Sequence, residues 1–163
     1  MSTLGIENIE HTDGTTAMTI DSTGRVLTPA RPAFMTSGTN YTQITGLSII
    51  KPHTVEFNIG GHYNGSTGEF TAPVAGVYLF GFWGLSYPHS TEVNHISYYK
   101  NGSQTFAKAY AQFNGTSSNH EMAAGSQLLQ LSVGDIITLR YNRGGGSGTA
   151  WQNQWSMHGH LVG

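Results

Sequence analysis

The sequence predicts an all-β protein of one domain, folded as an antiparallel sandwich. The composition is the first observation: 22 of the 163 residues are glycine and only 10% are charged, which is typical of many short strands joined by turns. The second observation is that short segments alternate apolar and polar side chains, while no segment has the periodicity of a helix. A chain of this length can bury a substantial core within a single domain.

The charge and hydropathy patterns exclude several classes of function. The net charge is −2 and the seven lysines and arginines are scattered singly, so the basic stripe of a nucleic-acid-binding protein is absent. There are no cysteines and hence no disulfides. No segment approaches the ~20 apolar residues of a membrane helix, and the N-terminus lacks the pattern of a signal peptide. We therefore expect a soluble protein that neither binds nucleic acid nor inserts into a membrane.

Residues 1–30 differ from the rest of the chain and are expected to form an extended arm. Ala17–Asp21 and Arg25–Thr28 alternate on either side of Ser22-Thr23-Gly24, which predicts a short β-hairpin. So small a ribbon cannot bury its apolar residues alone. The arm therefore needs a partner, either the arms of sister chains or a larger assembly. The alternative is a disordered leader.

Residues 31–163 divide into strands and turns. Pro73 stands just before the central strand, where a missing N–H does least harm, and Asn101-Gly102 is the strongest hairpin signal in the chain. The expected strands are one that follows Arg31–Phe34, then Tyr41–Lys51, His53–Ile59, Gly76–Leu85, Val93–Tyr99, Phe106–Gln112, Met122–Leu131, Ile136–Tyr141 and Trp155–Val162.

The central strand is apolar on both faces. Because side chains alternate with a period of two, Tyr78, Phe80 and Phe82 share one face. The opposite face carries Val77, Leu79, Trp83 and Leu85. A sandwich strand normally has one face in water, so the second apolar face needs a cover, and another copy of the chain is the simplest one. We expect the interface between copies to bury the three aromatic residues or else the face with Val77 and Leu79.

Four spaced motifs resemble a known family. GHYNGSTGEFTAPVAGVYLFGF (Gly61–Phe82) is followed by Lys100-Asn101-Gly102, by LLQLSVGDIITL (Leu128–Leu139) and by SMHGHLVG at the C-terminus. In this order the motifs resemble the globular head of complement component 1q, which belongs to the tumour-necrosis-factor superfamily. The resemblance covers residues 31–163. It implies a ten-stranded antiparallel jelly-roll sandwich, a tight homotrimer and a binding role, and it names no ligand.

Connection lengths divide the predicted sandwich into two ends, because alternate connections of an up-and-down antiparallel order lie at the same end. The tight turns are Pro73–Gly76, Asn101–Ser103 and Ser132–Asp135, and the longer connections are Tyr87–Glu92, Asn114–His120 and Arg143–Gln154. The direction of the last strand puts the C-terminus beside the tight turns. Since domain termini are often close together, we expect the arm there too. The long connections then point away, as binding loops on rigid scaffolds do.

The long connections hold the candidate ligand-binding residues. Trp151 offers a ring that could stack on a sugar, and the amides of Gln152 and Asn153 could bond to its hydroxyls. The other candidates at this end are Tyr87, His89, Asn119, His120 and Arg143, the last as a charged donor. The alternative is that Trp151 packs into the base of its own loop. The expected ligand is a glycan or protein on a host surface.

Two of the eight histidines, His158 and His160, share a face of the last strand. Around a threefold axis they would supply up to six imidazoles, enough for a metal or anion site. The alternative is packing in the trimer interface, which we favour, so we expect no metal or other cofactor.

Catalysis is not expected from this sequence either. There is no cysteine, no Gly-x-Ser-x-Gly elbow, and Gly144–Gly146 lacks the Lys and Ser/Thr of a phosphate-binding loop.

The arm carries a second resemblance. GTTAMTIDSTGRVLTPARPAF (Gly14–Phe34) is similar to the joint between the attachment segment and the head in structural proteins of tailed bacteriophages. It implies a virion-surface protein, a short fibre or spike, that docks to other virion proteins through residues 1–30. Two alternatives stay open: a capsid decoration or head-fibre protein that covers or stabilises the shell, and a free trimeric lectin-like module.

Overall fold

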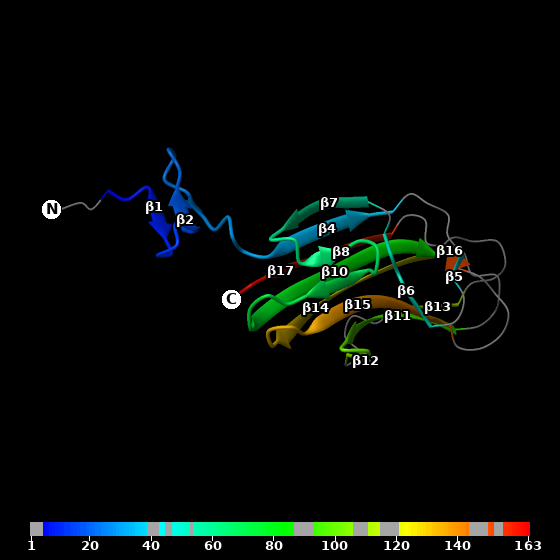
Figure 1. Cartoon of the computed structure of the whole chain (residues 1–163). Coiled ribbons are helices and arrows are strands. Elements are labelled where there is room, and N and C mark those ends of the chain that lie inside the picture. The colour runs from blue at the N-terminus through cyan, green and yellow to red at the C-terminus, as the bar shows by residue number, and fades with distance from the viewer. Residues whose placement is uncertain are drawn as a thin grey trace.

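A computed structural model describes residues 5–38, 43–44, 47–52, 54–86, 93–105, 111–114, 121–143, 150–151 and 155–163. Every regular element in these ranges is a β-strand, and the strands pair antiparallel, so the predicted all-β class is confirmed. Figure 1 shows two layers of strands and a small separate sheet beyond one end of them.

The first layer is a five-stranded sheet in the order β14-β10-β17-β4-β7. Its strands are β4 (Ala33–Ser37), β7 (Thr54–Ile59), β10 (Gly76–Ser86), β14 (Glu121–Leu131) and β17 (Trp155–Leu161). β10, the predicted central strand, pairs with β14 on one side and with β17 on the other. Both edges of its backbone are thus hydrogen-bonded within the chain, and only its two faces can make further contacts.

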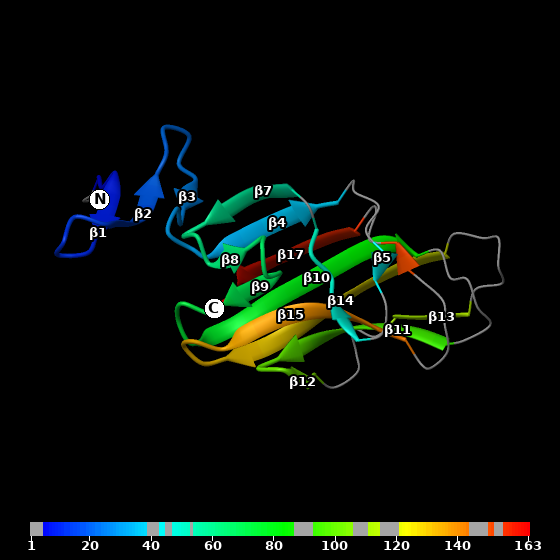
Figure 2. The ribbon, with the colours of Figure 1, turned by 45° about the vertical axis from the view of Figure 1, so that its right-hand side comes forward.

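The second layer follows the order β12-β11-β15-β9-β8, with β13 added on β11 and β6 on β15. Its strands are β6 (Ser48–Ile49), β8 (Tyr63–Asn64), β9 (Glu69–Thr71), β11 (Val93–Lys100), β12 (Ser103–Gln104), β13 (Ala111–Asn114) and β15 (Ile136–Arg143). The chain crosses between the layers from β10 to β11 and from β14 to β15, which gives the expected jelly-roll sandwich (Figure 2).

One expected strand is wrong as a single element. Tyr41–Lys51 contains two short strands that pair in different sheets: β5 (Gln43–Ile44) with β16 (Ala150–Trp151), and β6 with β15. A segment that bridges two sheets cannot keep one register, and the alternation of its side chains does not reveal this. In the segment expected as Phe106–Gln112, the structure describes β13, which begins at Ala111.

The core lies between the two layers and is rich in aromatic rings. Phe80 is fully buried, with its ring centroid 5.4 Å from that of Phe70, 5.6 Å from that of Tyr98 and 6.4 Å from that of Phe34. Tyr78 and Phe82 are buried beside it. The expectation that these three residues line the interface between copies is therefore wrong, because the second sheet of the same chain covers them. The face with Val77 and Leu79 is the one that points outward.

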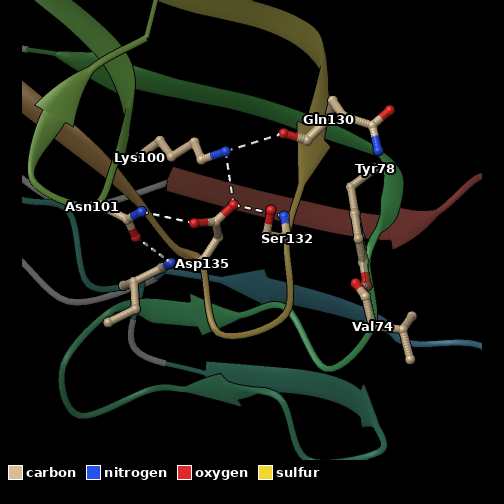
Figure 3. Close-up of polar contacts among 8 residues, drawn as sticks. Val74, Tyr78, Lys100, Asn101, Gln130, Ser132 and Asp135 are labelled. Atoms are coloured by element: carbon tan, nitrogen blue, oxygen red, sulfur yellow. Dashed lines mark hydrogen bonds and ion pairs between the residues drawn. The ribbon is translucent and has the colours of Figure 1, made fainter.

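The three tight turns meet at one end of the sandwich, as predicted (Figure 3). The Asp135 carboxylate lies 2.7 Å from Lys100 Nζ, and it also accepts hydrogen bonds of 2.7 Å from Asn101 Nδ2 and from the Ser132 N–H. The bond from Lys100, followed by those from Ser132 and Asn101, lowers the pKa of Asp135 to about 2. A carboxylate that stays ionised thus joins the β11–β12 turn to the β14–β15 turn.

The N-terminal arm is a three-stranded sheet of β1 (Asn8–Glu10), β2 (Thr16–Ile20) and β3 (Val26–Leu27). The predicted hairpin is present. Asp21 Oδ1 accepts hydrogen bonds from the N–H groups of Thr23 and Arg25, and Gly24 takes a φ of 82°. β1 was not expected. It pairs with β2, with Ile9 opposite Met18.

The arm and the C-terminus both lie at the tight-turn end, as predicted (Figures 1 and 2). The Leu161 N–H donates to the Pro32 carbonyl at 3.0 Å, which joins the exit of the arm to the end of β17. The Val77 N–H donates to the Gly163 carbonyl at 2.7 Å, which holds the last residue beside the start of β10.

Candidate binding end and outer face

The long connections leave the sandwich together at the end opposite the tight turns. In the first sheet Ser86, where β10 ends, lies opposite Glu121, where β14 begins. In the second sheet Val93, at the start of β11, lies opposite Asn114, and Asn94 lies opposite Arg143. An eleven-residue strand such as β10 spans roughly 35 Å, so the two ends are well separated.

Two of the predicted ligand residues are placed here by their backbone. Arg143 is the last residue of β15, and Trp151 lies in β16 opposite Gln43 of β5. The other candidates lie outside the described residues: Tyr87, His89, Asn119, His120, Gln152 and Asn153. Whether all of these side chains contact one ligand stays a prediction. The β5–β16 pair adds Gln43 and Ile44, which sequence reasoning had assigned to a longer strand.

The face of the five-stranded sheet that points away from the second layer is called the outer face below. Its described members are mainly apolar although no described strand is layered on it, and several are substantially exposed: Trp83 by 45%, Leu128 by 60% and Phe57 by 46%. Its other members, by strand alternation and cross-strand register, include Ala33, Met35, Ser37, Ile59, Val77, Leu79, Gly81, Met122, Ala124, Ser126, Gln130, Ser156, His158 and His160. A contiguous apolar surface of this kind marks a site of association.

His158 and His160, predicted interface residues, do lie on the outer face. His158 is opposite Gly81 of β10, and His160 is opposite Leu79. The described residues contain no group of three or more His, Asp or Glu side chains placed to hold a metal ion. The large pKa shifts in the core have structural causes: burial raises the pKa of Tyr63 to about 12, and burial, followed by the proximity of Tyr63, raises the pKa of Tyr98 well above its ordinary value.

The polar groups described in the structure thus support turns and packing, and the surfaces left for function are the long-loop end and the outer face. In the described part of the chain no helix is long and apolar enough to cross a membrane. A jelly-roll sandwich with one apolar face that none of its described strands covers, and with its long connections at one end, defines a class of self-associating binding modules.

Residues 33–162 match the profile of the C1q domain, so the chain belongs to the C1q domain family. Domains of this family are typically non-enzymatic binding modules that assemble as trimers. The expected jelly-roll fold is thereby confirmed, and the apolar outer face is in keeping with a trimer.

Curated relatives share moderate sequence identity with the chain. Caprin-2 of Danio rerio is 32% identical over 127 residues, which are 77% of this chain and 14% of that protein. Human complement C1q tumor necrosis factor-related protein 3 is 36% identical over 94 residues, which are 56% of this chain and 35% of that protein. The chain thus spans about a third or less of the length of these two relatives.

Solved structures share the fold at lower identity. The globular domain of zebrafish complement 1qA superposes with a TM-score of 0.67 at 18% identity, covering 82% of this chain and 98% of that one. Murine APRIL superposes with a TM-score of 0.56 at 14% identity, covering 80% of this chain and 99% of that one.

Proposed function

We propose that this chain is a non-enzymatic trimeric binding module on the surface of a bacteriophage virion, a short fibre or spike that recognises a glycan or protein on the host. The asymmetry between the two ends of the sandwich carries the proposal. The tight turns, the C-terminus and the arm lie at one end, and the long connections leave from the other. A module attached at one end and open to a ligand at the other has this arrangement.

The outer face would form the trimer contact. Leu79 and Val77 are half-buried in the single chain, and Trp83 and Leu128 still expose large apolar area. Complete burial of a large apolar side chain contributes roughly 1.5–3 kcal/mol, and threefold symmetry repeats each contact three times. Apolar burial on this scale is sufficient for a stable trimer in which the three long-loop ends point the same way.

The arm would attach the trimer to the particle. Ile9 and Val26 lie on the same face of the small sheet by their pairing with Met18 and Ile20, and they are 47% and 58% exposed. A sheet of this size needs a further apolar surface to be stable. The similarity of Gly14–Phe34 to phage attachment segments makes a virion protein the proposed source of that surface.

Removal of residues 1–30 tests the attachment. The truncated chain should remain a folded trimer, because no described strand of the arm pairs with a described strand of the two layers. When purified protein is added to particles that lack this component, the full chain should bind and the truncated chain should not. Binding of the truncated trimer at full occupancy would contradict the proposal.

The variant Trp151→Ala tests recognition at the long-loop end. We expect adsorption to host cells or to their purified glycans to weaken by roughly tenfold or more, with an unchanged trimer and melting temperature. The matched control is Val133→Ala, which removes an apolar side chain that is 68% exposed at the opposite end. If both variants adsorb like the wild type while Trp151→Ala particles lose stability, the chain is a capsid decoration protein instead.

A further inference from the structure

We propose that His158 and His160 make the trimer sensitive to acid: the outer faces associate while both imidazoles are neutral and separate when they are protonated. The inference rests on the trimer proposed above. It concerns the two histidines that the binding role does not use.

His158 lies in the interior of the outer face, on the middle strand of the sheet. It is opposite Gly81 on β10 and Met35 on β4. Its ring fills the space over the glycine, since a Cβ built on Gly81 would lie 2.4 Å from His158 Nε2. The imidazole is therefore packed against the sheet and half-buried before any partner arrives.

His160 is the next residue on the same face. It is opposite Leu79 on β10 and Ala33 on β4, and it is also half-buried. Two imidazoles this close repel each other when both are protonated. Burial and, after it, the proximity of His160 lower the pKa of His158 below its ordinary value.

The described side chains that surround the pair on the outer face include no carboxylate that could stabilise a protonated imidazole. From the flanking strands they are Ala33, Met35, Phe57, Ile59, Val77, Leu79, Trp83, Ser126, Leu128 and Gln130. The charged side chains at the margins of this set are Glu56, which accepts a hydrogen bond from Ser37 on the edge strand pair, and Arg31 before β4.

The sign of the pH dependence follows from where the protons bind. A His158 imidazole enclosed between apolar faces stays neutral, whereas in a separated chain, where its pKa is already below its ordinary value, it can still take up a proton as the pH falls. Once the pH is below the pKa of His158 in the separated chain, the separated chains bind more protons than the trimer, so assembly is complete above that pH and is lost as the pH falls through it. Counting His158 alone, separation takes up one proton per chain, which is three per trimer. The trimer association constant should then fall by up to roughly a thousandfold for each pH unit.

The test uses the full chain, with its oligomeric mass measured by light scattering from about pH 8 to about pH 5 and its fold followed by circular dichroism. We expect a trimer at the upper pH and folded, separated chains at the lower one. The double variant His158→Gln/His160→Gln should remain trimeric throughout, and the single variant His158→Phe, which keeps a ring over Gly81, should shift the transition to lower pH. His11→Gln is the control, because His11 is exposed beside Asp13 in the arm, and it should behave like the wild type.

The outcomes separate this inference from the proposed function. A wild-type trimer whose mass is constant over the whole range overturns the acid sensitivity alone. A transition that persists unchanged in both histidine variants, or one that coincides with loss of the β signal, overturns it as well. A monomer at the upper pH would overturn the proposed trimer and this inference with it.

Discussion

The two faces of the five-stranded sheet are similarly apolar in sequence and differ in what covers them. On the inner face, Phe80 contacts rings from three other strands of the same chain and is fully buried. On the outer face, Trp83 and Leu128 keep 45% and 60% of their surface exposed. The comparison shows that apolar character predicts that a face is buried but not what buries it. The inner face is covered by the second layer of the same chain, and the outer face, as we propose, by a sister chain.

The largest expected effect comes from a pair of aromatic truncations across the sheet. Phe80→Ala should lower the free energy of unfolding by about 3–5 kcal/mol, because it leaves a cavity among packed rings. Trp83→Ala on the outer face should cost the single chain far less and should weaken the trimer instead. Urea unfolding followed by fluorescence, with oligomeric mass measured in parallel, separates the two effects. An equal loss of chain stability in Phe80→Ala and Trp83→Ala would contradict the proposed difference between the inner and outer faces.

A charge placed on the outer face should separate the chains without unfolding them. In Leu128→Glu, trimer formation would bury a carboxylate in each copy without an opposite charge, so we expect folded monomers at micromolar concentration. Val133→Glu is the matched control, since Val133 is at least as exposed as Leu128 but lies in the tight β14–β15 turn. Sedimentation or light scattering gives the mass of each. A trimer in both variants would mean that Leu128 lies outside the interface.

The smallest expected effect compares two glycines that lie on opposite faces. A Cβ on Gly159 would lie 2.6 Å from Phe80 Cδ1 and 2.8 Å from Phe34 Cε1, inside the packed core. Gly159→Ala should therefore cost roughly 1–3 kcal/mol. Gly81→Ala meets only the His158 ring, which can rotate toward solvent in a separated chain, so we expect a smaller loss of chain stability. The denaturant midpoints of the two variants measure this difference in chain stability. A larger loss for Gly81→Ala than for Gly159→Ala would contradict the assignment of Gly159 to the inner face and Gly81 to the outer face.

Local signals in the sequence were sufficient to predict the tight turns and the end of the sandwich at which they lie. Asn101-Gly102 predicted a hairpin, and the two residues take φ values of 51° and 80°. Strand direction then placed this turn beside Ser132–Asp135, and Asp135 does bond to Asn101 and Lys100. β1 escaped prediction because three residues carry too little alternation to distinguish a strand, and only pairing with β2 defines it. The predicted ligand-binding role of the long connections stays a prediction, because most of its residues lie outside the described ranges.

By itself, the sequence determined the all-β class, the order of most strands, the tight turns and the two apolar faces of β10, because alternation and turn chemistry are local properties. Only the tertiary structure decided which of those faces is the core. Tyr78, Phe80 and Phe82 are interior because Phe34, Phe70 and Tyr98 arrive from distant parts of the chain to contact them. It also decided that His158 rests over Gly81 on the outer side, since these residues are brought together by the pairing of β17 with β10. Alternation separates one face from the other, but the identity of the inward face depends on contacts between segments far apart in the chain.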